Sequence, residues 1–410
     1  MREYELIELA NGIRVVHLEV SHTKIAHVGI MLDIGSRDER PEEQGLAHFW
    51  EHMAFKGTKK RKSFHIINRL ETLGGELNAY TTKEKICFYA SVLDNHLDKA
   101  VELLADITFH STFPEKQIEK ERMVILEEMA MYRDTPEDAI MDEFDELVFS
   151  GHALGTNILG TEETVQTFGQ DHFLNFIGRN LNTTKIIFTS VGNYPVKKLE
   201  KMVRKYMADI PCKNHTPERL PFVPLPPKRI VKQRSVTQVH HMMGRASFAL
   251  NDPKRIPFFM LTNILGGPAM NSRLNMSLRE KHGFVYGVEA HFSPYTDTGL
   301  FSIAFATDPK NHKKAIALIE REIHLLKTQS LTDTQLHKAK QQLKGQLAMS
   351  EENNNSMMLM MAKSLLDMQT VPGLDKLFQK IDSVSAHDLL DLANESWDWD
   401  EMSSLTFMPE

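Results

Sequence analysis

The chain has 410 residues, of which 41% are hydrophobic and 25% are charged, and these values are close to the averages of globular proteins. This length predicts two or three folded units, at roughly 150 residues per domain, and the composition excludes a disordered or fibrous chain. The formal net charge of −7 argues against a nucleic-acid partner, because an acidic protein repels the phosphate backbone.

The beginning of the chain lacks the features of a targeting segment. Charged residues occur from Arg2 onward, and no apolar core precedes a small-residue cleavage site, so we expect a cytoplasmic protein. No run approaches the roughly 18 apolar residues of a membrane span, so none is expected. Cys87 and Cys212 are the only cysteines, which excludes a disulfide framework and leaves histidine and carboxylate as metal ligands.

The same order of elements is expected in both halves of the chain. Residues 88–109 have the pattern of a strand running into an amphipathic helix, and residues 301–326 repeat it. Six prolines in the segment 211–229 favour an extended linker between the two copies. We therefore expect an α+β protein, with one domain at 1–210 and a similar domain at 230–410. Each domain is predicted to be a mostly antiparallel sheet with helices on one side.

Two features complete the predicted elements. Strands are expected at 12–20, 26–34 and 187–192 of the first half. In the second half, five methionines lie between 357 and 368 on a predicted helix. A flexible wall facing a substrate is one interpretation, but packing in the protein core is favoured.

The segment 45–58, GLAHFWEHMAFKGT, places two histidines one helical turn apart. His48 and His52 leave the same face of the predicted helix, which suits capture of a zinc ion by both imidazoles. Glu51 lies on the same flank, where its carboxylate can activate a water bound to the metal. The alternative is a pair of ordinary histidines on an amphipathic helix.

A third ligand has to be a carboxylate from another part of the chain, because catalytic zinc usually has three protein ligands. The predicted helix 118–129 carries Glu121 and Glu128, which are seven residues apart and lie on one face, while Glu127 points about 100° away. Glu128 is the expected ligand, and Glu121 is expected to orient the ligands from behind. A solvated helix glutamate is the alternative for Glu121.

With these residues identified, the chain resembles the inverzincin metallopeptidases of the pitrilysin family, and in particular the short-chain bacterial branch similar to the mitochondrial processing peptidase β subunit. HFWEHMAFKGT resembles the inverted zinc motif, and VILEEM resembles the helix of the third ligand. The resemblance implies that His48, His52 and Glu128 hold Zn²⁺, with Glu51 as the general base and Glu121 assisting. The second half has no such motif, so we expect one Zn²⁺ per chain, a catalytic domain at 1–210 and a metal-free domain at 230–410.

Two further segments carry the resemblance. GGELNAYTTKEKICFYA resembles an edge strand that takes up substrate, which implies substrate contacts from Asn78, Ala79 and Tyr80. NSRLNMSLREKHGFVYGVEA resembles the stretch whose arginine and tyrosine reach the substrate, here Arg279 and Tyr286.

The expected function is that of a zinc-dependent endopeptidase, which cleaves short or unfolded peptides inside a closed dimeric chamber. The resemblance favours a homodimer, with a heterodimer formed with a metal-free homologous subunit as the other possibility. The alternatives are a non-catalytic scaffold subunit and a peptide-binding module that does not cut.

Overall fold

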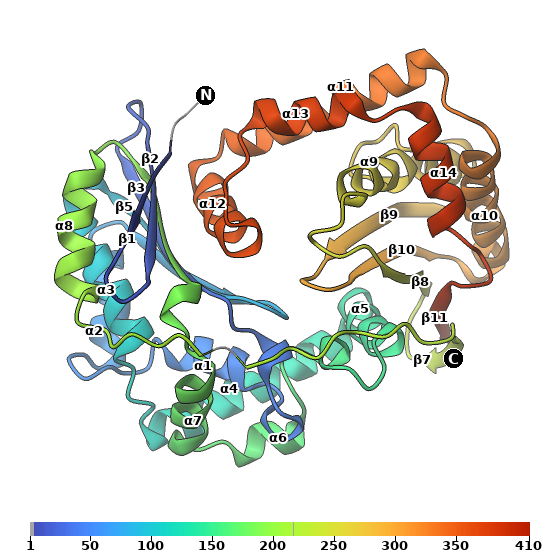
Figure 1. Ribbon diagram of the computed structural model, residues 1–410. Helices are drawn as coiled ribbons and strands as arrows, with labels where there is room; N and C mark the ends of the chain where they lie inside the picture. The colour runs from blue at the N-terminus through green and yellow to red at the C-terminus, as the bar shows by residue number, and fades with distance from the viewer. Residues whose placement is uncertain (1–3, 216) are drawn as a thin grey trace. The chain divides into compact units, whose positions relative to one another are not determined.

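The computed structural model describes residues 4–215 and 217–410, so Met1, Arg2, Glu3 and Thr216 of the predicted first domain and linker lie outside the described residues. The chain forms two compact units, each assembled from three stretches (Figure 1). None of the helices in the described residues combines the length and the apolar content that a membrane span requires. Unit 1 comprises Met1–Met129, Thr156–Arg219 and Met349–Gly373, and unit 2 comprises Ala130–Gly155, Leu220–Ala348 and Leu374–Glu410.

Unit 1 contains a six-stranded sheet with the strand order β1-β2-β6-β3-β5-β4. Only β2 and β6 pair in parallel, and every other neighbouring pair is antiparallel. All seven residues of β6 are buried, as expected for a strand inside a sheet that is covered on both faces. The strands are β1 Tyr4–Glu8, β2 Arg14–Glu19, β3 Ile25–Leu32, β4 Glu76–Thr81, β5 Ile86–Leu93 and β6 Ile186–Gly192.

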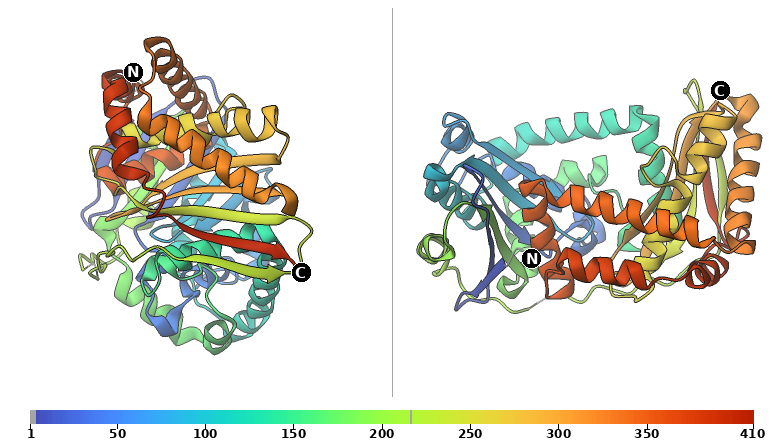
Figure 2. Two further views of the ribbon diagram at one scale, coloured as in Figure 1. Left: turned by 90° about the vertical axis from the view of Figure 1, so that its right-hand side faces the viewer. Right: turned by 90° about the horizontal axis from the view of Figure 1, so that it is seen from above.

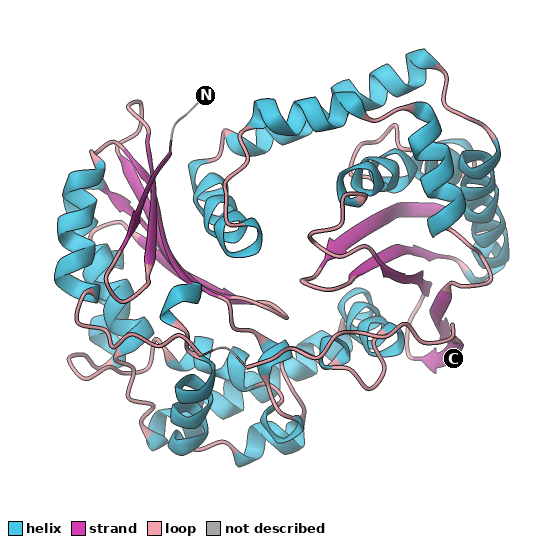
Figure 3. Ribbon diagram, viewed as in Figure 1, coloured by secondary structure: helices cyan, strands magenta, loops and turns pink. Residues whose placement is uncertain are grey.

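Helices cover both faces of this sheet (Figure 3). Helices α3 and α8 pack on one face, and α12 packs on the other against β2, β3 and β6. Met357, Met358 and Met361 of α12 are buried among apolar side chains of the sheet, which confirms for them the expected core packing. The helices of unit 1 are α1 Leu46–Met53, α2 Ser63–Glu71, α3 Leu97–Phe109, α6 Glu162–Thr167, α7 Gln170–Asn180, α8 Val196–Met207, α12 Asn354–Met368 and most of α4 Glu115–Asp134.

Unit 2 contains a five-stranded sheet with the order β7-β11-β8-β10-β9, in which only β7 and β11 are parallel. The left panel of Figure 2 faces this sheet, with β11 in red beside β7 and β8. The strands are β7 Arg229–Arg234, β8 Val239–Ser247, β9 Val285–Pro294, β10 Gly299–Thr307 and β11 Ser403–Pro409.

The helices of unit 2 also lie on both faces of their sheet. Buried side chains of α9, α10 and α14 form one core on the sheet, while α5 packs on the opposite face against β8 and β11. The helices are α5 Pro136–Val148, α9 Arg255–Gly266, α10 His312–Thr328, most of α11 Asp333–Glu351, α13 Leu374–Ser383 and α14 Ala386–Ser396, with a π-helix at Asn275–Lys281.

The two units share one topology, which confirms the prediction of two α+β halves. Apart from β1, which is an additional edge strand of the first sheet, the order is the same: the first strand pairs in parallel with the last one (β2 with β6, β7 with β11), and the third strand (β4, β9) forms an edge. Helix α1 corresponds to α9, α3 to α10 and α4 to α11, because each pair occupies the same place in the element order. The next helices, α5 and α12, are exchanged: each completes the unit built mainly from the other half of the chain.

This exchange predicts that the halves are not stable alone. A fragment of residues 1–219 lacks α12, and a fragment of residues 220–410 lacks α5, so each leaves one apolar face of its sheet in water. We expect both fragments to aggregate when expressed separately and to give a soluble complex when co-expressed. Soluble yield and cooperative thermal unfolding, compared with the intact chain, are the measurements. A fragment that unfolds cooperatively at the melting temperature of the intact chain contradicts this role of the exchanged helices.

Candidate metal centre

Helix α1, which carries His48 and His52, starts at a tightly packed turn. Gly45 has a left-handed φ of 94°, and a Cβ atom there would lie 2.4 Å from the carbonyl oxygen of Leu159. The carboxylate of Glu39 accepts hydrogen bonds from the backbone N–H groups of Gly45 and Ala47, at 3.0 and 2.7 Å. These contacts satisfy two of the free donors at the helix start and fix where α1 begins.

The two histidines of α1 meet a carboxylate of α4. Nε2 of His48 lies 3.8 Å from Oε1 of Glu128, and Nε2 of His52 lies 3.5 Å from Oε2 of the same side chain. His48, His52 and Glu128 each offer one ligand atom, and these three atoms lie within 4.8 Å of one another. The sequence-predicted ligands therefore come together in unit 1, although 76 positions separate His52 from Glu128 in the printed sequence.

The donor set fits a zinc ion. Nitrogen and oxygen ligands about 2.0–2.1 Å from zinc lie roughly 3.3 Å apart in a tetrahedron. The two nitrogen–oxygen separations found here, 3.5 and 3.8 Å, are somewhat longer. Burial, together with the neighbouring His52, lowers the pKa of His48 to about 3, so this imidazole stays neutral as a metal ligand must. One carboxylate and two imidazoles leave a fourth position for water or substrate.

Glu121 is not part of the cluster of ligand atoms, but it contacts the imidazole of His52. Nδ1 of His52 and Oε1 of Glu121 are 3.0 Å apart, and Nζ of Lys56 lies 2.6 Å from Oε2 of Glu121. Burial opposes ionisation, but the hydrogen bonds of His52 and Lys56 bring the pKa of Glu121 below its usual value. An ionised Glu121 accepts a hydrogen bond from the N–H group at Nδ1 of His52. The other ring nitrogen, Nε2, then carries the lone pair, which is directed toward Glu128.

Glu51 is held on the other side by strand β4. The hydroxyl of Thr81 donates a hydrogen bond of 2.6 Å to Oε2 of Glu51. Burial raises the pKa of Glu51, while the bond from Thr81 and the charge of His52 act in the opposite direction. The carboxylate therefore has one fixed oxygen and an environment that favours uptake of a proton.

The turn between β4 and β5 is anchored by buried ion pairs. Glu84 of this turn pairs with Arg37 at 2.7 Å, and its backbone carbonyl accepts a hydrogen bond from Arg219, in the middle of the predicted linker. Lys85 pairs with Asp367 of α12 at 2.6 Å. Segments distant in sequence thus fix the end of β4 and, with it, the position of Thr81.

The predicted substrate-binding residues of the first half lie on β4. This strand is the edge of its sheet and pairs only with β5 among the described strands. Asn78, Ala79 and Tyr80 are all within it, and the ring of Tyr80 packs against Tyr89. Edge strands offer unpaired backbone groups to a peptide, but contact with substrate stays a prediction.

Arg279 and Tyr286 come together in unit 2. The guanidinium carbon of Arg279 lies 5.8 Å from the centre of the Tyr286 ring, a cation–π distance. Tyr286 is 92% exposed, which is unusual for an aromatic side chain and leaves its hydroxyl available to a ligand. Because the metal cluster belongs to unit 1, an approach of these two residues to it stays a prediction.

Sequence reasoning missed three residues that shape the site: Thr81, Lys56 and Glu39. Thr81 follows the quoted NAY segment directly, and strand alternation places it on the opposite face from Tyr80. That alternation was the available signal for Thr81. Lys56 lies four residues after His52, but it begins a short basic run, 56–63, of the kind that usually forms a surface loop. The half-buried Glu39 belongs to no motif.

Comparison with known proteins places the chain in a family. Residues 14–162 match Insulinase (Peptidase family M16), and residues 167–343 match the Peptidase M16 inactive domain. An uncharacterized zinc protease of Bacillus subtilis is 32% identical over 94% of this chain and 93% of its own length. One of Streptomyces coelicolor is 31% identical over 94% of this chain and 86% of its own length.

Solved structures show the same fold. A protease from Helicobacter pylori has a TM-score of 0.91 at 21% identity and covers both chains completely. A peptidase M16 inactive domain from Pseudomonas fluorescens also has a TM-score of 0.91, at 18% identity, over 100% of this chain and 98% of that one.

The chain belongs to the insulinase family of peptidases, family M16. This confirms the predicted pitrilysin-family relationship. Family membership and the three converging ligands together make the protein a zinc metallopeptidase.

The cluster predicts how zinc binding depends on the two adjacent glutamates of α4. Glu128→Gln should weaken zinc binding by at least the roughly 10–100-fold that loss of an outer-shell partner costs, because it removes a charged ligand. Glu127→Gln is the matched control, since Glu127 is exposed and outside the cluster. Competitive titration with a zinc chelator measures both. Equal zinc affinity of the two variants would rule out Glu128 as a ligand.

Proposed function

We propose that the protein is a zinc-dependent endopeptidase that cleaves short or unfolded peptides, with one zinc ion per chain. The observation that carries the proposal is the convergence of His48, His52 and Glu128 with their ligand atoms within 4.8 Å. The printed names of the relatives as zinc proteases support it. A scaffold subunit or a non-cutting peptide-binding module would have no need of this complete donor set.

In the proposed mechanism, Glu51 is the general base. His48, His52 and Glu128 would hold a zinc ion, which would supply Lewis-acid polarisation of the scissile carbonyl and lower the pKa of a water molecule. Glu51 removes a proton from the attacking water and delivers it to the departing amine. The hydrogen bond from Thr81 fixes one oxygen of Glu51 and leaves the other free for this transfer. Glu121 keeps His52 oriented throughout.

Substrate binding is assigned to both halves of the chain. We assign to Asn78, Ala79 and Tyr80 the uptake of the peptide as an added strand at the edge of the first sheet. Arg279 and Tyr286 would donate hydrogen bonds to the scissile carbonyl or to the oxyanion that develops from it. The cation–π contact between these two side chains supports a common role.

We further propose that the working form is a homodimer whose subunits enclose the substrate, and that it acts in the cytoplasm. A heterodimer with a metal-free homologous subunit is the alternative. The presence of both the metal cluster and the Arg279–Tyr286 pair in one chain supports the homodimer, because no partner is needed to supply either. A closed chamber would admit only peptides that are short or unfolded.

Two variants near the metal should separate chemistry from metal binding. Glu51→Gln should reduce turnover of a quenched fluorescent peptide to background while zinc content is unchanged. Thr81→Val should lower kcat about 10- to 100-fold, because a hydrogen bond to a charged group contributes roughly 1.5–3 kcal/mol. Thr81→Ser, which retains the hydroxyl, is the control and should retain most of the activity. Normal cleavage by Glu51→Gln refutes the assignment of the base.

The oligomeric state is tested on the purified full-length chain. Light scattering combined with size-exclusion chromatography should give twice the mass of 46.9 kDa, and peptidase activity should elute with that species. Monomers that become active only after another subunit is added would establish the heterodimer instead.

A further inference from the structure

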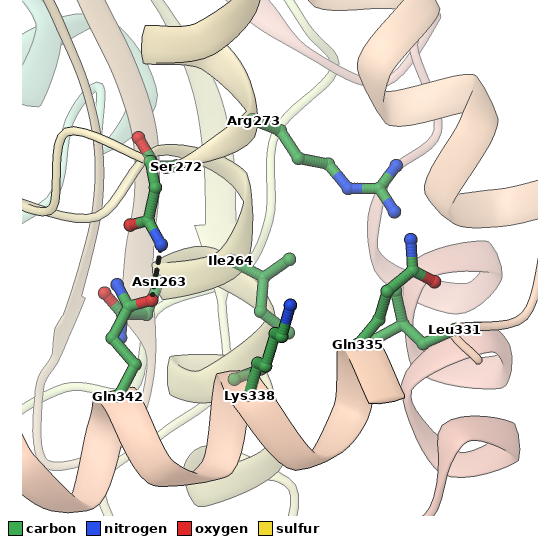
Figure 4. A pocket seen from close by; sticks show the side chains of 10 residues that line it. Asn263, Ile264, Ser272, Arg273, Leu331, Gln335, Lys338 and Gln342 are labelled. Carbon is green, nitrogen blue, oxygen red and sulfur yellow. Dashed lines mark hydrogen bonds between the residues drawn. The ribbon is translucent and has the colours of Figure 1, made fainter. Parts of the chain in front are cut away.

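A polar pocket lies in unit 2, between the end of α9, the loop that follows it and the first turns of α11 (Figure 4). Its volume is about 170 Å³, which corresponds to the share of roughly five or six water molecules. Arg273 and Lys338 bring two positive charges to the lining, and none of the ten lining residues is an aspartate or a glutamate. The pocket is therefore cationic, in a chain whose overall charge is negative.

The pocket is lined by the two helices of unit 2 that correspond to the metal-binding helices of unit 1. Helices α9 and α11 correspond in the element order to α1 and α4, which hold the metal cluster between them. Facing the pocket, α11 carries Gln335 and Gln342, seven residues apart like Glu121 and Glu128 of α4. These two side chains end in amides instead of carboxylates, and Lys338 lies between them in the sequence. The same pair of helices is thus built in unit 2 without the negative charge that a metal cation needs.

The amide groups of the pocket are arranged to donate hydrogen bonds. Oε1 of Gln335 accepts from the backbone N–H of Thr332 at 2.9 Å, and Oε1 of Gln342 accepts from Nδ2 of Asn271 at 3.1 Å. Because the oxygens are already engaged, the NH₂ groups of both glutamines are the ends left for a ligand. Figure 4 shows the Gln335 amide directed toward the guanidinium of Arg273.

Both cations of the pocket have unused hydrogen-bonding capacity. Within the described residues, Arg273 makes no hydrogen bond, and its nearest carboxylate, Glu322 of α10, is 3.9 Å away. Lys338 also forms no salt bridge with a carboxylate among the described residues. Burial lowers the pKa of Arg273, with Glu322 acting against this, which reflects how poorly the guanidinium is solvated or paired. A half-buried arginine with five donors and one distant counter-ion gains by binding an anion.

We propose that this pocket binds a small oxyanion, either a phosphate or a carboxylate, between Arg273 and Lys338. Arg273 supplies the fork of N–H donors that matches two oxygens, and Lys338 supplies a point charge. The NH₂ groups of Gln335 and Gln342 complete the donor set. The site is independent of the metal cluster and of peptide hydrolysis, so its test does not depend on activity.

The test is isothermal titration of the full-length protein at low ionic strength with three probes. Inorganic phosphate tests the phosphate source. N-acetylglycine tests a terminal carboxylate, and N-acetylglycinamide is its uncharged control. We expect saturable binding of one molecule per chain for at least one of the two anions, and none for the amide. Absence of saturable binding of either anion up to about 10 mM, or equal binding of the amide, overturns the proposal.

Variants locate the site. Arg273→Gln should weaken binding at least tenfold and Lys338→Gln roughly three- to tenfold, in line with the strength of charge-assisted hydrogen bonds. Lys376→Gln, at an exposed lysine of α13 outside the lining, is the matched control and should bind like the wild type. Lys338 is exposed, so its replacement should fold normally and decides the question even where Arg273→Gln destabilises the protein. Binding that is unchanged in Lys338→Gln, or weakened equally in Lys376→Gln, rejects the pocket as the site.

Discussion

The hydrogen bond between Glu121 and His52 is the interaction on which the metal centre depends. It joins the helix of the inverted motif to the helix of the third ligand, and it decides which nitrogen of His52 carries the proton. With Nδ1 committed to Glu121, Nε2 is directed at Glu128. Lys56 holds Glu121 from the far side, so the carboxylate remains ionised in a partly buried position. The orientation of the ligand His52 therefore depends on two charged residues that are not ligands, Glu121 and Lys56.

The sequence was sufficient to predict a feature wherever that feature follows from a local periodicity or a motif. His48 and His52 share a helix face because four residues make about one turn, and the duplicated strand–helix order at 88–109 and 301–326 foretold two sheets. Glu128 could be selected over Glu127 because only the former has the seven-residue relation to Glu121. These inferences used local geometry, which a single sequence records.

Long-range packing set the limit of what the sequence could predict. Strand alternation gives the face of Thr81, but it does not show that the hydroxyl reaches Glu51, since this contact depends on how β4 lies against α1. The exchange of α5 and α12 could not be predicted either. An amphipathic pattern predicts that one face of a helix is buried, but it does not identify the sheet against which that face packs. The methionines of α12 were assigned correctly to a core, yet the sheet they cover is formed by the first half of the chain.

The exchange of helices also affects folding during synthesis on the ribosome, because the first sheet is made long before the helix that covers one of its faces. The last strand of the first sheet, β6, ends at Gly192, whereas α12, which covers one face of that sheet, ends at Met368. At about 5–20 residues per second, the intervening chain takes roughly 10–35 s to emerge. Throughout this interval α12 cannot cover Val16, Leu18 and Met31, so this core closes only after most of the second half has been made.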